Sequence, residues 1–331
     1  MEERSASMSY VTTTREKWFG RIDPAGSEDT FYWHQVVQFQ SVDTLPDSHQ
    51  PNQIVFLGYQ SDEGVKRNSG RVGAAKGPEA LRAALSKMAL HFEPNHYQLI
   101  DVGDVVTDGS DLEQSQLELA EKVEKLLRKG YLPIVLGGGH EISYGHGTGI
   151  RQWIGSEKKL GIINLDAHFD LRPYPAGPHS GSPFRQLMDD CYSEGTTFHY
   201  LPIGINPAGN QKVLFEVHRA AGQQYVSQKD LEYGIDNCLS EINQFSEEVD
   251  HLYLTLDLDV LPASAAPGVS APAAFGVDPV IIRRLVDHIF STGKVVSFDV
   301  AELNPLYDDG RTAKLAASII YDIVMKYSLD Q

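Results

Sequence analysis

The chain has 331 residues, of which 45 are acidic and 28 are basic, giving a formal net charge of −17. Nucleic-acid-binding proteins and proteins that dock on anionic lipid normally present a basic surface, so this charge argues against both classes. No apolar run approaches the roughly 18 to 20 residues of a membrane span, and the first residues lack the apolar core of a secretory signal. The two cysteines, Cys191 and Cys238, lack the spacing of a disulfide framework or a thiolate zinc site. These features predict a soluble, cytoplasmic, globular protein.

The chain divides into an irregular start and a regular remainder. Residues 1–50 show no sustained periodicity, and we predict that they form an N-terminal arm packed on the body. Residues 51–331 contain no repeat and no long linker, so we predict a single catalytic domain there. Short apolar runs alternate in it with longer stretches of helical spacing. The predicted strands are Ile54–Leu57, Tyr97–Val102, Pro133–Leu136, Leu160–Leu165, Thr197–Ile205, His251–Leu256 and Val295–Val300.

The helical stretches between these strands indicate the fold class. The clearest predicted helix runs from Asp111 to Lys129, where Ser110 and Glu113 have the spacing of a capping box. The last predicted helix begins after Asp309. Strands that alternate with helices in this way predict an α/β protein with a parallel sheet covered on both faces. Ligands of such sheets bind at the carboxyl ends of the strands, so polar residues at those positions need close inspection.

The first polar segment follows the strand that ends at Leu136. Three glycines precede His140 and Glu141 there, and glycines let the backbone turn tightly and approach a neighbour closely. A phosphate-binding loop would need Gly-Lys-Ser/Thr at this point, and a dinucleotide site would need a further glycine. Neither is present. Taken alone, the segment is as compatible with a structural turn as with a metal-ligating histidine.

Two further strands end in acidic residues at two-residue spacing. The segment NLDAHFD contains Asp166, His168 and Asp170, and LTLDLDV contains Asp257 and Asp259. In an extended chain such residues point to one side, where burial is costly unless the groups are paired or bind a cation. The alternatives are a solvated loop for the first segment and a strand edge that faces water for the second. A fourth segment, VSFDVAELNP, carries two more carboxylates, of which the first could simply cap or pair with an arginine.

The first three segments together supply two histidines and four aspartates. Imidazole with several carboxylates is a ligand set for divalent metals, and it favours Mn²⁺ over Zn²⁺ because oxygen predominates. Six ligands are too many for one catalytic zinc. Two ions about 3.5 to 4 Å apart can hold a bridging water and lower its pKa towards neutrality. The residues therefore predict a binuclear metal hydrolase.

These segments, in this order, resemble the ureohydrolase family of arginases, agmatinases and formimidoylglutamases. The resemblance extends over nearly all of the chain from about Ile54 and includes SGRVGAAKGPEALR at Ser69–Arg82 and DLDVLPASAAPGVSAP at Asp257–Pro272. It implies a three-layer α/β/α sandwich with a central, mostly parallel sheet and two Mn²⁺ ions per subunit. It also implies a homo-oligomer that acts on a small amidino-acid substrate.

The resemblance further assigns roles to individual residues. Asp170 would take a proton from the bridging water and pass it to the departing amine, and Glu302 would pair with the cationic amidinium or guanidinium of the substrate. The six implied metal ligands are His140, Asp166, His168, Asp170, Asp257 and Asp259. Candidates to support these ligands are Tyr144, His146, Asn164 and His179.

The region after the DxHxD segment points to the subfamily. Arginases carry a histidine where this chain has Phe184, which disfavours arginase activity, and HSGSPFRQL, DLRP and WFGRIDP resemble formimidoylglutamase. That enzyme hydrolyses N-formimidoyl-L-glutamate to L-glutamate and formamide in histidine breakdown. Its substrate carries two carboxylates, so we predict that Arg172 and Arg185 bind them, unless each is an ordinary ion-pair arginine. The alternatives are agmatinase, guanidinobutyrase or arginase-like activity, and a non-catalytic metal-binding family member.

Overall fold

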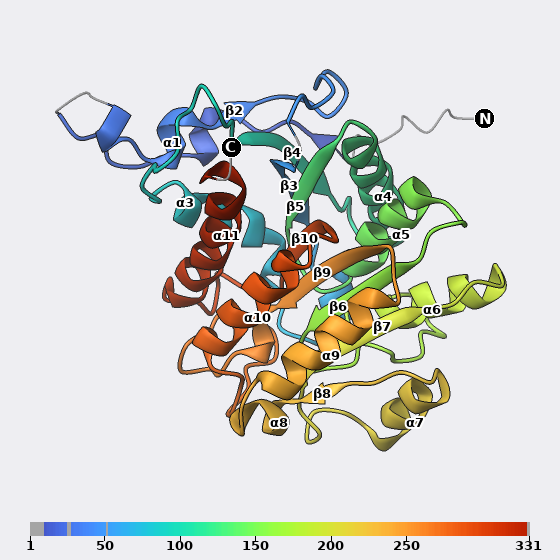
Figure 1. The fold of residues 1–331 in the computed structure, drawn as a ribbon. Coiled ribbons are helices and arrows are strands. Elements are labelled where there is room, and N and C mark those ends of the chain that lie inside the picture. Colours follow the sequence, from blue (N-terminus) through green and yellow to red (C-terminus); the bar gives the residue numbers. More distant parts are fainter. Residues whose placement is uncertain (1–9, 25–27, 51, 330–331) are drawn as a thin grey trace.

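The computed structural model describes residues 10–24, 28–50 and 52–329, which form one ten-stranded sheet with helices on both faces (Figure 1). Because the strands are buried on both faces, they are rich in apolar residues along their whole length. The strands are β1 (Tyr10–Val11), β2 (Gln38–Phe39), β3 (Gln53–Gln60), β4 (Ile100–Val106), β5 (Tyr131–Leu136), β6 (Leu160–Leu165), β7 (His199–Ile205), β8 (Val226–Ser227), β9 (His251–Asp257) and β10 (Val295–Ala301).

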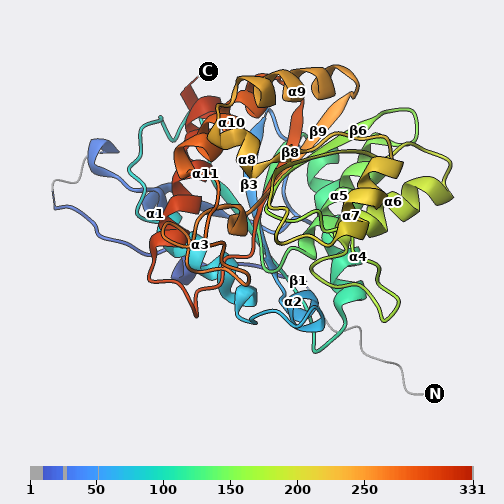
Figure 2. The same cartoon turned by 90° about the horizontal axis from the view of Figure 1, so that it is seen from below.

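The helices cover the sheet in two layers, which Figure 2 shows on opposite sides of the strands. The helices are α1 (Trp33–Val36), α2 (Glu63–Arg67), α3 (Gly77–Leu85), α4 (Leu112–Arg128), α5 (Ile142–Ile154), α6 (Pro183–Ser193), α7 (Lys212–Ala220), α8 (Gln228–Glu232), α9 (Asp236–Glu247), α10 (Pro279–Ser291) and α11 (Arg311–Leu329). The apolar residues of α3, α9, α10 and α11 share one core with one face of the sheet, and those of α4, α5 and α6 share a second core with the other face. The predicted three-layer α/β/α sandwich is confirmed.

The strands follow the order β1-β4-β3-β5-β10-β9-β6-β7-β8, with β2 also paired to β4. All pairs are parallel except that of β1 with β4, so the sheet is mostly parallel, as predicted. Four central neighbours, β5, β10, β9 and β6, carry the polar segments singled out in the sequence, although up to about half of the chain separates them. None of the helices in the described residues combines the length and apolar character that a bilayer crossing requires.

The prediction for β3 ended too early, at Leu57 rather than Gln60, and the predictions for β4 and for the start of α4 also differ from the structure. The strand predicted at Tyr97–Val102 lies at Ile100–Val106, because β4 continues beyond Val102 through Gly103 and the buried Asp104, which an apolar pattern does not reveal. Two buried aspartates of β4, Asp101 and Asp104, each form an ion pair with the buried guanidinium of Arg82 at 2.6 Å. The predicted capping box of α4 is wrong. Asp111 is the N-cap and accepts a hydrogen bond from the backbone of Gln114, while Glu113 pairs with Arg67.

The described residues before position 51 pack along the edge of the sheet at β4. β1 adds to β4 as an antiparallel strand, and β2 adds as a parallel one. Trp18 is buried, and its indole nitrogen donates to Asp101 at 2.6 Å, while Lys17 forms an ion pair with Asp104 at 2.7 Å. Trp33 is buried in the same core as α3 and α11.

Candidate metal centre

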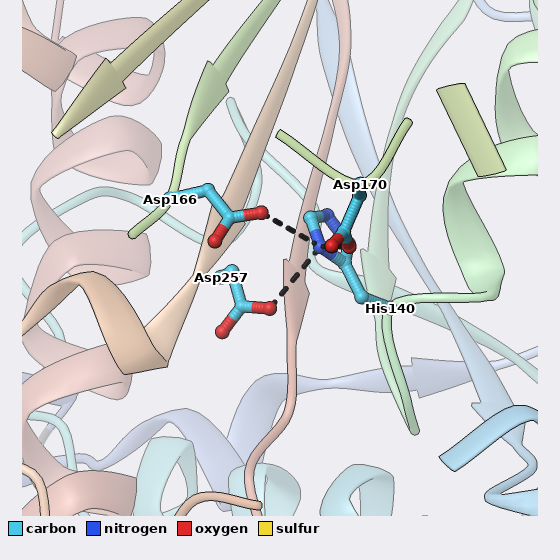
Figure 3. Close-up of side chains that lie close together, drawn as sticks. All are labelled: His140, Asp166, Asp170 and Asp257. Atoms are coloured by element: carbon cyan, nitrogen blue, oxygen red, sulfur yellow. Dashed lines mark ion pairs between the residues drawn. The ribbon is translucent and has the colours of Figure 1, made fainter. Parts of the chain in front are cut away.

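The carboxyl ends of β5, β10, β9 and β6 lie side by side, and the loops that follow them converge on one site (Figure 3). The turn after β5 is tight because the backbone passes close to a neighbouring loop. A Cβ at Gly138 would lie 1.9 Å from the carbonyl oxygen of Ser61, so only glycine fits there. The six side chains that meet at this edge, here called the metal centre, are His140, Asp166, His168, Asp170, Asp257 and Asp259.

His140 lies at the bottom of the metal centre and is almost completely buried. Its Nδ1 is surrounded by three carboxylate oxygens, at 3.1 Å from Asp166, 3.0 Å from Asp170 and 3.1 Å from Asp257 (Figure 3). These four residues form one group whose potential ligand atoms lie within 4.8 Å of one another. A nitrogen with three oxygens at this spacing can surround a single divalent ion.

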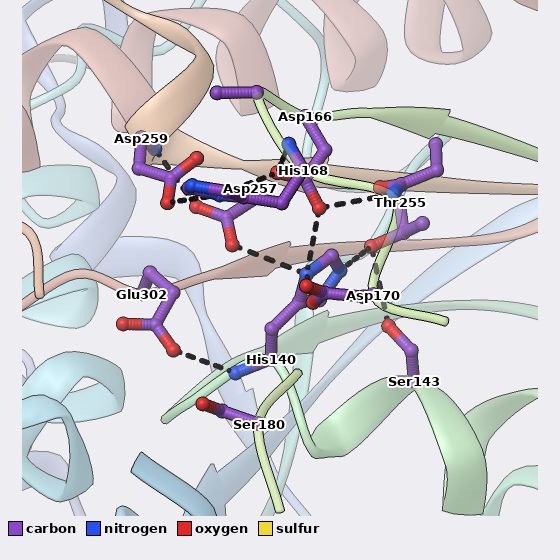
Figure 4. A network of polar contacts seen from close by, with 12 residues as sticks. His140, Ser143, Asp166, His168, Asp170, Ser180, Thr255, Asp257, Asp259 and Glu302 are labelled. Carbon is purple, nitrogen blue, oxygen red and sulfur yellow. Dashed lines mark hydrogen bonds and ion pairs between the residues drawn. The ribbon is translucent and has the colours of Figure 1, made fainter. Parts of the chain in front are cut away.

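A second group lies beside the first and faces the solvent more openly. The Nδ1 of His168 is 3.1 Å from Asp259 and 3.4 Å from Asp166 (Figure 4). Asp166 therefore belongs to both groups and offers one oxygen to each. Two clusters that share a carboxylate are the arrangement expected for a pair of ions held close together.

The ligand side chains converge because the backbone turns after β6 and β9, not because the chain is extended there. The residues after β6 form a bend rather than an extended strand, and Asp170 has a φ of 47°, in the left-handed region. After β9 the chain turns into a short 3₁₀ helix, η4 (Leu258–Val260), and the carboxylate of Asp257 accepts a hydrogen bond from the backbone of Asp259 at 2.8 Å. The prediction of extended chain with alternating side chains is wrong at both places. Turns in the backbone bring the ligands together.

The electrostatics of the metal centre are those of crowded, buried carboxylates. Burial, followed by repulsion from Asp259 and Asp166, raises the pKa of Asp257 well above its usual value. Burial and the charge of Asp166 likewise raise the pKa of Asp170 to about 6. Burial alone would lower the pKa of His140, but its three carboxylate neighbours raise it well above the usual value. Concentrated negative charge of this kind is stabilised by a cation.

The polar atoms of the metal centre also fit divalent ions. Buried polar groups nearly always have hydrogen-bond partners, so buried atoms without one are informative. Among the described residues, His140 Nδ1, Asp259 Oδ1 and Glu302 Oε2 are buried and have no hydrogen-bond partner. Two of these atoms belong to the predicted ligands. Imidazole nitrogens with carboxylate oxygens suit Mn²⁺ and related borderline-to-hard ions.

The metal centre forms the floor of a cavity of about 370 Å³. Arg172 lines this cavity, and its Nη1 donates a hydrogen bond to Asn68 at 2.7 Å. Asn68 in turn donates to the hydroxyl of Ser180 at 3.1 Å, and Ser180 also lines the cavity. The rim therefore presents a guanidinium held in place by polar neighbours. Asn68 was not singled out in the sequence, and Ser180 lies in the HSGSPFRQL segment but was not predicted to contact the site.

Of the two predicted substrate-binding arginines, Arg172 lines the cavity and Arg185 does not. The Nε of Arg185 forms an ion pair with Asp189 one helical turn later, at 3.0 Å. A different arginine, Arg71, does line the cavity, although its guanidinium is held by the carbonyl oxygens of Val269 and Ser270. Of the predicted pair, only Arg172 is brought to the metal centre.

Glu302 follows β10 and points towards the cavity. Its φ of 68° is in the left-handed region, a conformation that costs about 1 to 3 kcal/mol and is common at functional sites. One carboxylate oxygen accepts a hydrogen bond from the backbone N–H of His140 at 2.9 Å, while the other has no partner (Figure 4). Burial, followed by the charge of Glu141, raises the pKa of Glu302 to about 8. A cation placed at the free oxygen would offset this shift and favour the ionised carboxylate, which can accept its hydrogen bonds.

Of the remaining predicted residues, two contact the metal centre and two lie outside it. Phe184 is completely buried and packs its ring edge-on against the ring of His140, with 5.4 Å between centroids, so an apolar group occupies this position. Asn164 donates to Asp166 at 3.0 Å and therefore supports a ligand. Tyr144 and His179 instead contact Asp190 and the backbone around Pro173, outside the ligand set.

An α/β/α sandwich with a histidine and aspartate cluster at the carboxyl edge of its sheet defines a class of metal-dependent hydrolases. The Arginase family model matches residues 52–326. A formimidoylglutamase from Geobacillus sp. (strain WCH70) is 43% identical over 320 residues, which cover 96% of this chain and 97% of the relative. The chain therefore belongs to the arginase family, and the predicted ureohydrolase resemblance is confirmed.

Solved structures agree with this assignment. Trypanosoma cruzi formiminoglutamase with Mn²⁺ superposes with a TM-score of 0.75 at 28% identity, covering 87% of this chain and 98% of the other. Formimidoylglutamase from Bacillus subtilis superposes with a TM-score of 0.79 at 22% identity, covering 93% of this chain and 97% of the other, which supports the fold.

Proposed function

We propose that this protein hydrolyses N-formimidoyl-L-glutamate to L-glutamate and formamide. The observation that carries the proposal is one cavity lined by five of the six residues of the metal centre, by Glu302 with its unpartnered oxygen and by Arg172. The sixth residue, Asp166, contacts both His140 and His168. The substrate has an amidine at one end, which suits Glu302, and two carboxylates at the other, of which Arg172 would bind one. The Geobacillus relative, named formimidoylglutamase, supports the same choice of substrate.

The proposal includes two Mn²⁺ ions per subunit. His140, Asp166, Asp170 and Asp257 would hold one ion, and Asp166, His168 and Asp259 would hold the other. Bound together, two such ions supply a water activated near neutral pH and a Lewis acid for the reacting carbon. The orphaned buried ligand atoms support this assignment, as does the manganese in the T. cruzi formiminoglutamase structure.

Residues of the chain would provide the binding and proton-transfer steps. Glu302 would hold the amidinium through its free oxygen and so present the amidine carbon to the metal centre. Asp170 would accept a proton from the attacking water and donate it to the glutamate nitrogen as the carbon–nitrogen bond breaks. The carbon keeps the water oxygen and leaves as formamide, and the amine leaves as glutamate.

Arg172 would recognise a carboxylate of the substrate at the rim. A guanidinium suits a carboxylate because two parallel hydrogen bonds form, and Asn68 limits its freedom before binding. Arg185 is already engaged by Asp189, so the second predicted clamp depends on release of that ion pair. A dicationic substrate such as agmatine would be repelled by Arg172.

A substrate panel with metal removal and restoration tests the proposal. The chain is treated with chelator and assayed before and after Mn²⁺ is added back, using formimidoylglutamate, arginine, agmatine and guanidinobutyrate. We expect Mn²⁺-dependent release of formamide from formimidoylglutamate. Urea release from arginine or agmatine at a higher kcat/KM would assign another ureohydrolase activity, and no turnover with both ions bound would indicate a non-catalytic member.

Three further expectations remain proposals that the family resemblance supports. We expect the chain to form a homo-oligomer, to act in histidine degradation and to be cytoplasmic. Both cysteines are buried and free, which is compatible with a reducing compartment. Light scattering after gel filtration measures the oligomeric state, and growth on histidine after gene deletion measures the pathway role.

A further inference from the structure

We propose that Asp299 is a positioning residue that acts through Thr255 to fix the tautomer and orientation of His140 for metal binding. These three residues come from β10, β9 and the turn after β5, which are neighbours in the sheet. All three are almost completely buried. The inference depends on His140 being a metal ligand and is independent of which amidine is the substrate.

The hydrogen bonds along this chain of residues have a fixed direction. The hydroxyl of Thr255 donates to Asp299 Oδ1 at 2.7 Å, and a hydroxyl has only one hydrogen to give. Thr255 Oγ1 is also 3.1 Å from His140 Nε2 (Figure 4). Thr255 must therefore accept at this contact, so the hydrogen of the imidazole lies on Nε2. The lone pair of His140 is then on Nδ1, the atom that faces three carboxylates and has no hydrogen-bond partner.

Asp299 is itself held on all sides by donors. Its Oδ2 accepts from the hydroxyl of Tyr253 and contacts Nδ1 of His146 at 2.5 Å. Nε2 of His146 contacts the hydroxyl of Ser297 at 2.6 Å, so the ring is fixed at both ends. A carboxylate anchored in this way keeps its other oxygen aimed at Thr255. The alternative from the sequence, that Asp299 caps or pairs with an arginine, does not match these partners.

The arrangement matches a physical need of metal sites. A ligating imidazole usually donates its second nitrogen to an acceptor, which selects the tautomer and orients the ring. For His140 that acceptor is a hydroxyl polarised by a buried carboxylate rather than the carboxylate itself. The network was only partly visible in the sequence, since His146 was a candidate support while Thr255 carried no signal.

Isothermal titration of Mn²⁺ into the chelator-treated chain tests the inference without any substrate. Thr255→Val keeps the volume and removes the hydroxyl, and Asp299→Asn keeps the shape and removes the charge. We expect each to weaken binding of one Mn²⁺ equivalent about 10- to 100-fold, the range found for partners of metal ligands. Thr255→Ser restores the hydroxyl and should bind within about threefold of the unsubstituted chain, which is below that range.

Thr148→Val is the matched control, because the hydroxyl of Thr148 in α5 has no hydrogen-bond partner. We expect it to bind both equivalents normally, and the metal-free Thr255→Val and Thr148→Val chains to unfold at similar temperatures. Unchanged Mn²⁺ affinity in Thr255→Val would overturn the inference. Equal weakening in Thr255→Ser and Thr255→Val would overturn it too, because packing rather than the hydroxyl would then matter. If Asp299→Asn does not fold, the two Thr255 variants still decide.

Discussion

The two histidines of the metal centre contact the same kind of carboxylate but lie in different surroundings. The side chain of His140 is 1% exposed, and its second nitrogen is bonded into the sheet through Thr255. The side chain of His168 is 29% exposed and faces the cavity beside Gly209, where an added Cβ would lie 3.2 Å from its Nε2. One half of the metal centre is therefore built into the core, while the other half forms part of the cavity wall.

The two halves of the metal centre have different tasks. The inner half, around His140, has its ring orientation fixed by the fold before any ion binds. The outer half, around His168, is open to the cavity. Shared Asp166 couples the two halves. We therefore expect changes to the inner half to affect the chemistry most and changes at the cavity rim to affect substrate binding.

The largest effect is expected for Asp170→Asn in the inner half. Asparagine keeps the shape but cannot accept and return a proton, and such proton transfer contributes about 10²- to 10⁴-fold to rate. We expect kcat for formamide release to fall by that factor. Metal content measured on the same sample separates loss of proton transfer from loss of an ion. Asp189→Asn, outside the cavity, is the control and should stay near full activity. Near-normal turnover of Asp170→Asn with both ions bound would remove Asp170 from the mechanism.

A smaller effect is expected at the rim, where Arg172→Met removes the guanidinium. A hydrogen bond to a charged group contributes about 1.5 to 3 kcal/mol, and exposure places Arg172 at the lower end, so kcat/KM should fall about tenfold, mainly through KM. Arg185→Met is the matched comparison, because Arg185 is bound to Asp189 and does not line the cavity. Steady-state kinetics of both variants measure the difference. A larger rise in KM for Arg185→Met would reverse the roles of the two arginines.

The sequence predicted the core elements well where burial is uniform and less well where polar groups are buried. The strand at Leu160–Leu165 has the predicted bounds, because a strand covered on both faces is a continuous apolar run. The C-terminal end of β4 was missed because the strand continues through Gly103 and Asp104, and no local pattern shows that Asp104 is buried against Arg82. Strand order was also out of reach, since it depends on contacts between distant segments.

The metal centre shows the same limit at the level of single residues. The ligand types were predicted because histidine and aspartate at strand ends are unusual, although bends rather than an extended chain bring them together. Thr255 and Asn68 were not predicted, because threonine and asparagine are common residues and their position in the sequence does not reveal their hydrogen-bond partners. Their importance lies in the partners that the fold provides. Thr255 contacts His140 and Asp299. Asn68 contacts Arg172 and Ser180.

Chelation kinetics should separate the two halves directly. Because His168 is partly exposed at the cavity and His140 is buried, we expect a chelator to remove one Mn²⁺ equivalent faster than the other. The rate of removal is measured after rapid mixing from the colour change of a dye that binds the released manganese. The fast phase should become faster in His168→Gln and keep its rate in Thr148→Val. A single phase for both equivalents would mean that burial does not separate the two sites.

The smallest effect concerns His218, whose buried ring packs against Phe169 beneath the loop that carries His168 and Asp170. Burial lowers the pKa of His218 below its usual value, although the carbonyl oxygen of Gln224 opposes this shift. The folded chain thus binds fewer protons than the unfolded chain, so the stabilising contribution is complete above about pH 6.5 and is lost as the pH falls towards the lowered pKa. Urea unfolding of metal-free protein at pH 7.5 and 5.5 measures this loss, which should be smaller in His218→Gln. An equal loss of unfolding free energy in both chains would show that His218 does not contribute to the acid sensitivity of the fold.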